Sequence, residues 1–224
     1  MARDLKALFD PRSVAVVGVS ADKSKWGYWF ARDALKGAHR RQVFLVGRSG
    51  GELFGQTVHR SLADLPEAPE LVILSVPASG LEQAVDESLA AGARGLVAIA
   101  AGLGEQGAEG RAREASIVER VRAAGAVLVG PNCLGVFDSE AELDLASNPL
   151  PGGPIGFISQ SGNIALETGL LLADLGLGFS RLVSVGNQAD LDAAKAKLTA
   201  AHKVKVTCHA VDLSKAADAR KLAT

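Results

Sequence analysis

The stretch Ser13-Val-Ala-Val-Val-Gly-Val-Ser20 decides the fold of this chain. Its run of valine and alanine ends at a glycine, which predicts a buried strand followed at once by a tight turn. Residues Trp26–Lys36 then fit a helix that ends at Gly37, and Gln42–Val46 fit a second strand. A strand, a turn, a helix and a second strand form the first unit of an open α/β sheet.

The same alternation continues along the chain. A helix is expected from Ser79 to Ala91, where Ser79 and Glu82 have the spacing of a capping box, and a polar-faced helix is expected over 107–124. Further strands are expected at Leu71–Val76, Leu96–Ile99 and Ala126–Val129. Because all five strands are nearly continuous apolar runs, they are typical of a parallel sheet that is covered on both faces. The sequence therefore predicts an α/β fold with a doubly wound parallel sheet.

A second α/β unit is expected after a linker. Residues 138–154 lack periodicity and contain three prolines and two glycines, which is typical of a connecting segment. A strand at Ile155–Ile158, a turn at 159–162 and a helix at Asn163–Leu175 then repeat the opening pattern of the chain, and Arg181–Val185 fits another strand.

The composition changes near Asp192. All 25 glycines lie before residue 193, and the net charge is −6 before this point and +5 after it. A solvated terminal helix would explain the change, and so would a segment of different origin joined at this place. We divide the chain into a first domain, a linker, the start of a second domain and an atypical tail. These parts cover residues 5–145, 146–154, 155–192 and 193–224.

Length, charge and composition exclude several classes of protein. The 224 residues suffice for one large domain or two small ones, and 24 basic residues balance 25 acidic ones, so no overall field attracts nucleic acid or an anionic membrane. Two cysteines form no disulfide framework and no metal-type spacing. The apolar runs are too short to span a bilayer, and the first residues contain no secretory signal. We therefore expect a cytoplasmic protein with no metal site and with neither nucleic acid nor membrane as partner.

Ligands of an open parallel sheet bind where its strands end. The turn Gly18-Val19-Ser20, with Lys25 and Gly27 at the start of the following helix, offers backbone N–H groups, a hydroxyl and positive charge to a phosphate. An ordinary strand-to-helix turn is the alternative. Ser159-Gln160-Ser161-Gly162 has the same chemistry and is a second candidate anion site. Its pattern differs from the Gly-x-Ser-x-Gly motif of hydrolases and no partner histidine lies nearby, so we expect no catalytic residue here.

Three later turns complete the set of candidates. The strand ends contribute Val76 and Pro77, Ala101 and Gly102, and Asn132 and Cys133. A buried asparagine in such a turn bonds either a ligand or the backbone of its own loop, and both readings stay open for Asn132. A cysteine after a strand either lies near a ligand or is an inert core residue, and the inert case is the commoner one.

Six of these segments together resemble a known family. They are Val14–Ser20, Val76–Ala78, Ala101–Leu103, Val129–Gly135, Phe157–Gly162 and Ser184–Asp190. In residues and order they resemble the α-subunit-like half of the NDP-forming acyl-CoA synthetases, such as the ADP-forming acetyl-CoA synthetases, which are relatives of succinyl-CoA synthetase. The resemblance covers about residues 5–192. The segment from Val204 to Ser214 faintly resembles the third strand of a short-chain dehydrogenase.

The resemblance implies a fold and a ligand for each unit. It implies a Rossmann-like domain that binds coenzyme A, followed by an incomplete flavodoxin-like ligase domain. The CoA phosphates would lie at Gly18, Val19, Ser20, Lys25 and Gly27, the pantetheine or adenine would pass Val76 and Pro77, and the thiol would lie near Ala101, Gly102, Asn132 and Cys133. Ser159, Gln160, Ser161 and Gly162 would hold the phosphate of a phosphohistidine at a helix N-terminus.

The sequence departs from the family pattern in three places. Val46-Gly47-Arg48 replaces the usual end of the second strand, although Arg48 could still reach a phosphate. His202 and His209 match no phosphohistidine loop, so we assign no catalytic residue. No ATP-grasp half is recognised, so ATP or ADP with Mg would come only through missing domains or a partner subunit.

The sequence leads to three functional hypotheses. The first is the CoA-binding portion of an acid–thiol ligase that acts through acyl phosphate and phosphohistidine. It would bind CoA or acyl-CoA, be inactive alone and take an ATP-grasp subunit as partner. The second is a stand-alone CoA-binding or regulatory module. The third is a nicotinamide-dependent oxidoreductase, which the missing Gly-x-Gly-x-x-Gly turn and the absence of a Tyr/Lys catalytic pair, with Tyr28 the only tyrosine, disfavour.

Overall fold

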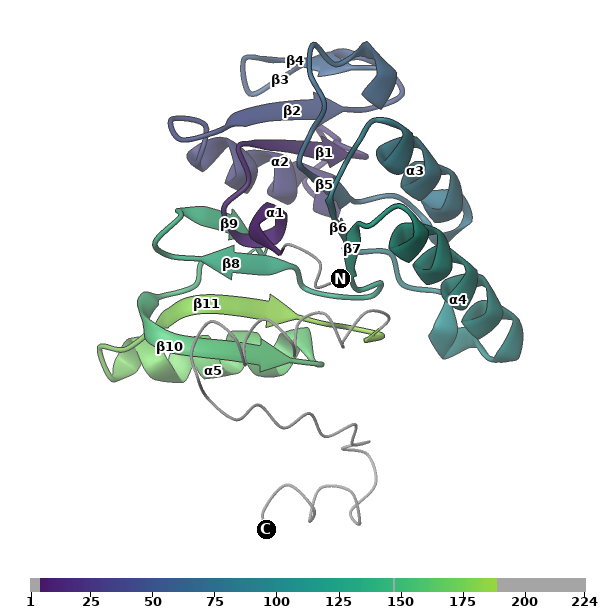
Figure 1. The fold of residues 1–224 in the computed structure, drawn as a ribbon. Helices are drawn as coiled ribbons and strands as arrows, with labels where there is room; N and C mark the ends of the chain where they lie inside the picture. Colours follow the sequence, from purple (N-terminus) through teal and green to yellow (C-terminus); the bar gives the residue numbers. More distant parts are fainter. Residues whose placement is uncertain (1–4, 147, 189–224) are drawn as a thin grey trace.

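A seven-stranded sheet forms the centre of the first unit (Figure 1). The computed structural model describes residues 5–146 and 148–188. The strands of this sheet are β1 (Ser13–Val17), β2 (Gln42–Val46), β3 (Gly51–Leu53), β4 (Gln56–His59), β5 (Leu71–Leu74), β6 (Gly95–Ala98) and β7 (Val127–Val129). Their order is β3-β4-β2-β1-β5-β6-β7, and only β3 runs antiparallel to its neighbour within this sheet. The parallel strands therefore follow the Rossmann order, with a topological switch point at the ends of β1 and β5.

Strand β1 is the central strand because hydrogen bonds and side chains enclose it on every side. Val16 is in register with Leu45 of β2 and with Ile73 of β5, and all five residues of β1 are buried. A strand in this position cannot alternate apolar and polar residues, since both of its faces are covered. This explains the continuous apolar run at the start of the sequence.

Helices cover both faces of the first sheet, as the doubly wound prediction requires (Figure 1). Helices α1 (Lys6–Phe9) and α2 (Trp26–Lys36) pack on one face, where Phe30 of α2 is buried against Val14 and Val16. Helices α3 (Ala78–Ala90) and α4 (Ala108–Ala123) pack on the other. Short 3-10 helices lie at Leu62–Asp64 and Gly104–Gln106. The predicted α/β fold with a Rossmann-like doubly wound sheet is confirmed.

The second unit is a four-stranded sheet in the order β10-β11-β8-β9. Its elements are β8 (Val136–Asp138), β9 (Leu143–Leu145), β10 (Gly152–Ser159), α5 (Gly162–Asp174) and β11 (Phe179–Ser184). Strands β10 and β11 are parallel, whereas β8 runs antiparallel to both β11 and β9. The expectation that 138–154 is an irregular linker is wrong for β9, whose two leucines are buried in the core of the first unit, and for the start of β10, which begins at Gly152 and not at Ile155. A three-residue strand is too short to show a period, and its pairing partner determines it.

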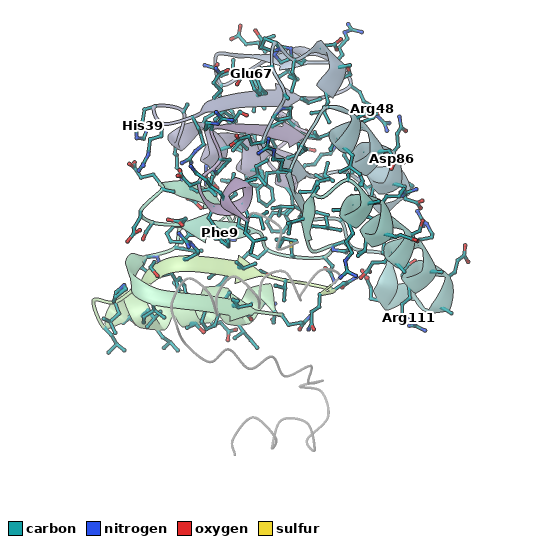
Figure 2. All side chains as sticks on the ribbon, in the orientation of Figure 1. Phe9, His39, Arg48, Glu67, Asp86 and Arg111 are labelled. Atoms are coloured by element: carbon teal, nitrogen blue, oxygen red, sulfur yellow. The ribbon has the colours of Figure 1, made fainter. Side chains whose placement is uncertain are left out.

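Side-chain contacts join the two units. Within the second sheet, the buried Asp138 carboxylate accepts from the Arg181 guanidinium at 2.6 Å, and that guanidinium reaches the first unit, where it lies 4.7 Å from the ring of Phe9. Figure 2 shows Phe9 at the junction of the two sheets. The Lys36 ammonium lies 2.8 Å from the buried Asp33 carboxylate in its own helix and 3.1 Å from Asp144 of β9. The contact between Lys36 and Asp144 therefore holds the hairpin of β8 and β9 against helix α2.

Several local expectations differ from the structure. Helix α3 begins at Ala78 directly after Pro77, so Ser79 lies inside the first turn and its side chain does not cap the helix. Strands β3 and β4 and helix α1 were not expected. By contrast, β2 and α2 have the bounds that the sequence predicts. Within the described ranges, no helix has both the length and the apolar character that crossing a membrane requires.

Two glycines allow helix α2 to rest directly on the turn after β1. Gly18 has a φ of +90°, which few residues other than glycine adopt. A Cβ atom on Gly27 would lie 2.0 Å from the carbonyl oxygen of Gly18, so no larger side chain fits there without movement of the backbone. The first turn of α2 is therefore fixed to the end of β1 by a contact between two backbones.

We predict that Gly27→Ala destabilises the protein by about 2 kcal/mol, because the added methyl group overpacks this contact. The matched control is Gly80→Ala in the first turn of α3, where a Cβ meets only the Arg48 guanidinium at 3.9 Å. That change should stabilise the protein by about 0.5–1 kcal/mol, since alanine favours helix. Chemical denaturation measures both. Equal effects of the two substitutions would contradict the close contact.

The buried Asp144 carboxyl gives a prediction about pH. Burial raises the pKa of this carboxyl above its ordinary value of 3.8, and the hydrogen bond from Lys36 offsets this only in part. Such a group stabilises the folded state most below its unfolded pKa, and that contribution is lost as the pH rises through the folded pKa. As the pH is lowered from about 7 to about 4, the free energy of unfolding of the wild type should therefore rise relative to that of Asp144→Asn. Urea titrations across this range measure the difference, and a fall instead of a rise would refute the assignment.

Candidate functional site

The carboxyl ends of β1, β2, β5, β6 and β7 bring the predicted turns to one edge of the first sheet. Gly18 and Val19 donate their backbone N–H groups to the carbonyl oxygen of Val46, at 2.9 and 3.2 Å. These two N–H groups therefore hold the turn against β2. The site that this turn offers to a ligand consists of its side chains and of the helix that follows.

The first turn of α2 supplies free backbone donors at this edge. The N–H groups of Trp26 and Gly27 have no hydrogen-bond partner among residues 5–146 and 148–188, as is usual for the first residues of a helix. The Ser20 hydroxyl accepts from the N–H of Asp22 at 3.1 Å, which tightens the loop before the helix. The edge therefore presents the positive end of a helix dipole at the switch point of the sheet.

Basic side chains lie along this edge of the sheet. Lys23 and Lys25 are exposed in the loop, and Arg48 extends from the end of β2 toward the first turn of α3, where its guanidinium faces Gly80 (Figure 2). Asp22 is the acidic residue of the loop, and hydrogen bonds from the N–H and the hydroxyl of Ser24 lower the pKa of its carboxyl. That carboxylate is thus occupied within its own turn, and the remaining charge of this region is positive.

An aromatic cluster supports the loop, and the sequence reasoning missed it. Tyr28 makes edge contacts with Trp29 and with Phe54 of the turn between β3 and β4, with ring centroids 5.2 and 5.0 Å apart. The indole N–H of Trp29 donates to the carbonyl oxygen of Lys23 at 2.8 Å. The sequence does contain a signal for this cluster, because both tryptophans and the only tyrosine of the chain lie within residues 26–29.

The turns after β5 and β6 lie beside the first turn. Val76 is half-buried and packs close to Gly18: a Cβ atom added to Gly18 would lie 3.2 Å from one of the Val76 methyl groups. Pro77 and Ala101 are exposed. Gly102 has a φ of +100° and donates its N–H to the carboxylate of Glu105. The structure therefore brings these predicted residues to the same edge as the helix N-terminus.

The turn after β7 places its two candidates differently. Asn132 is exposed and not buried as expected, has a φ of +55° and donates its backbone N–H to the carbonyl oxygen of Ala100 at 2.9 Å. Cys133 is buried, and its thiol lies 3.2 Å from the carbonyl oxygen of Ala98. Burial raises the pKa of this thiol to about 12, so it stays protonated and unreactive at neutral pH. A contact between Cys133 and a ligand stays a prediction.

The second candidate anion site lies at the start of α5. Ser161 caps this helix by accepting from the N–H of Ile164 at 3.4 Å. The Ser159 hydroxyl donates to the carbonyl oxygen of Ser161 at 2.7 Å, and the Gln160 amide donates to that of Gly186 at 3.2 Å. Gly162 packs against Leu134. The side chains of this turn thus shape the loop and cap the helix.

Backbone hydrogen bonds connect the turn that starts α5 with the turn after β7. Val185, after β11, donates its N–H to the carbonyl oxygen of Ser159 at 2.8 Å, and Asn187 donates its N–H to that of Pro131 at 2.9 Å. Within the parts of the chain that the structure describes, no group of three His, Cys, Asp or Glu side chains is arranged to hold a metal ion. The edge is suited to an anionic ligand, held by backbone donors and basic side chains.

Comparison with known protein families assigns both units. A family model for the CoA binding domain matches residues 12–138, and a model for the succinyl-CoA ligase like flavodoxin domain matches residues 152–224. The second match continues past Asp192, where the resemblance was expected to end. The predicted helix Ala193–His202, strand Val204–Val211 and helix Ser214–Ala223 all lie outside the described residues.

Curated and solved relatives agree with this assignment. The α subunit of acetate–CoA ligase [ADP-forming] I from Pyrococcus furiosus is 37% identical over 199 residues, which cover 85% of this chain and 42% of the relative. A crystal structure from Pyrococcus horikoshii OT3 superposes with a TM-score of 0.83 at 31% identity, covering 88% of this chain and 46% of the other.

A second solved relative is the dinucleotide-forming acetyl-coenzyme A synthetase 1 of Ca. Korarchaeum cryptofilum, in complex with phosphate and ADP. It has a TM-score of 0.81 and 31% identity, and the match covers 87% of this chain and 42% of the relative. The chain thus spans less than half the length of these relatives. Because the first family model matches more than half of the chain and fits the Rossmann-like sheet, the chain belongs to the family of CoA-binding domains.

Proposed function

We propose that this chain binds coenzyme A or acyl-CoA at the carboxyl edge of its first sheet, as the CoA-binding part of an ADP-forming acyl-CoA synthetase. The observation that carries the proposal is the N-terminus of α2, which rests on the Gly18 turn at the switch point of the sheet. This arrangement directs free N–H groups and the positive end of a dipole at one place. A ligand with several phosphates and a long, partly apolar arm fits it.

The phosphates of CoA would lie at the first turn of α2. The N–H groups of Trp26 and Gly27 would donate to phosphate oxygens, and the ammonium groups of Lys23 and Lys25 would add charge. Arg48 faces the first turn of α3 across the same edge, so its guanidinium could bind a second phosphate in a bidentate manner.

The arm and the thiol of CoA would follow the neighbouring turns. Val76 and Pro77 offer an apolar surface for pantetheine beside the Gly18 turn. Ala101, Gly102 and the exposed Asn132 lie further along the strand order, after β6 and β7, and would surround the thiol end. The thiol would therefore approach the side on which the second sheet joins the first.

We further propose that the turn from Ser159 to Gly162 binds phosphate. Ser161 caps α5, and the first N–H groups of a capped helix remain donors toward an anion. A solved relative forms a complex with phosphate and ADP, which supports phosphate chemistry in this type of protein.

The nucleotide and Mg would belong to an ATP-grasp domain or partner subunit. The overall reaction would then convert an acid, CoA and ATP to acyl-CoA, ADP and phosphate, with one oxygen of the acid leaving in the phosphate. A stand-alone CoA-binding module would use the same first site.

Calorimetry with CoA tests the proposal directly. We expect the full chain to bind CoA, and Ser20→Trp to weaken binding at least about tenfold because the indole occupies the loop where the phosphates would lie. Ser116→Trp, on the exposed side of α4, is the matched control and should bind as the wild type does. A folded wild type that gives no binding would refute the function, and full affinity of Ser20→Trp would refute the placement.

The role of Arg48 has its own signature. Arg48→Ala should weaken CoA binding about tenfold at low salt, and the loss should shrink at high salt because screening weakens a charge–phosphate contact. Arg111→Ala serves as control, since Arg111 lies at the far end of the α3–α4 layer (Figure 2). Titrations at low and high salt measure both variants. An unchanged affinity of Arg48→Ala at low salt would exclude the contact.

A further inference from the structure

Asn187, just after β11, joins the second unit to the candidate CoA site. Its side-chain amide nitrogen lies 2.9 Å from a carboxylate oxygen of Glu105 and 2.9 Å from one of Glu114, and donates to both. Its amide oxygen accepts from the side chain of Asn132 at 3.4 Å, and its backbone N–H donates to the carbonyl oxygen of Pro131 at 2.9 Å. One side chain of the second unit thus contacts two loops of the first.

The two carboxylates in turn hold the loop after β6. Glu105 accepts the N–H of Gly102 with its other oxygen, and the buried Glu114 accepts the N–H of Gly104 at 3.1 Å. Burial raises the pKa of Glu105, but hydrogen bonds to the carboxylate, the first from Gly102, outweigh burial and lower it overall, so this group is ionised at neutral pH. The loop conformation therefore depends on two carboxylates that share one amide donor.

The contact suits an amide, which combines two N–H donors with one acceptor. Two carboxylates that approach one point repel each other unless a donor lies between them. An amide NH₂ supplies one N–H to each oxygen and still leaves an oxygen to accept from Asn132. A carboxylate in place of the amide would keep the shape but reverse both contacts.

The same turn also contacts the candidate phosphate loop. Gly186 accepts from the side-chain amide of Gln160 at 3.2 Å, and a Cβ on Gly186 would lie 2.2 Å from the carbonyl oxygen of Pro131. The chain at 186–187 is therefore held between the turn that starts α5 and the turn after β7. Residues 186–187 thus connect these two turns.

We propose that Asn187 is a positioning residue of the CoA site. It fixes the loop from Ala101 to Glu105 and the side chain of Asn132 from the second unit, so that affinity for CoA depends on a residue outside the turns proposed to bind it. This inference rests on the proposed function. It adds that the second unit takes part in CoA binding by holding the loops at the thiol end.

The test compares CoA binding by the wild type and by Asn187→Asp in the full chain. At pH 8, Asn187→Asp should bind CoA about tenfold more weakly, because three carboxyl groups then meet and the loop moves. The deficit should shrink toward about pH 5.5, where a proton shared among the introduced carboxyl group, Glu105 and Glu114 restores a hydrogen bond. A purely structural loss would not follow this pH profile.

A second substitution provides a rescue. In Asn187→Asp with Glu105→Gln, donor and acceptor exchange places, so at least half of the logarithmic loss of affinity should return at pH 8. The matched control is Gln83→Glu, which makes the same amide-to-acid change beside Glu87 on the exposed side of α3, where the amide donates at 2.7 Å. That variant should bind CoA as the wild type does.

The outcomes separate the two proposals. A wild type that binds CoA together with an unaffected Asn187→Asp, or a loss that neither acidic pH nor Glu105→Gln reduces, would overturn the role of Asn187 alone. A folded wild type that does not bind CoA would overturn the proposed function and this inference with it. If Asn187→Asp fails to fold, Asn187→Ala removes the donor without adding charge, and wild-type affinity in that variant would equally overturn the role.

Discussion

The contact between helix α2 and the turn after β1 is the constraint on which the site depends. Gly18 and Gly27 bring backbone against backbone, so the helix begins at the end of the central strand and nowhere else. Because β1 is the strand where the order of the sheet reverses, the helix dipole points into the crevice that this reversal opens. The Ser20 hydroxyl and two lysines of the same loop, together with side chains from the turns after β2, β5, β6 and β7, lie along the edge that this contact fixes.

The second unit covers the first sheet where another helix would otherwise be needed. The hairpin of β8 and β9 packs beside α2, and Leu143 and Leu145 enter the same core as Val14 and Val16. Buried carboxylates secure this hairpin, with Asp138 paired to Arg181 and with Lys36 bridging Asp33 and Asp144. The ends of β10 and β11 are thereby brought next to the turn after β7, so the two candidate anion sites share one continuous edge.

Elements that depend on local sequence signals were predicted with correct bounds, whereas several elements that depend on contacts with distant residues were missed. Strand β2 and helix α2 have the predicted bounds because their apolar patterns and the glycine that ends α2 are local signals. Strands β3, β8 and β9 have three residues each and were not predicted, because they lie outside the apolar runs and depend on their pairing partners. Strand β7 is equally short but was predicted, because it lies within the apolar run that starts at Ala126. Ser79 shows how a local motif fails: β5 ends at Leu74 and α3 begins at Ala78 directly after Pro77, so the serine lies inside the helix and cannot cap it.

The sequence by itself determined the class of fold, the places where ligands of such a sheet bind and the family resemblance, because turns that follow buried strands carry glycines and small polar residues in fixed order. The tertiary structure decided what those residues do. It enclosed the Cys133 thiol in the core, exposed Asn132 and brought Asn187 within 2.9 Å of Glu105 and Glu114, which lie more than seventy residues before it. Hydrogen bonds of that kind depend on how two sheets pack, and no local pattern in the chain encodes them.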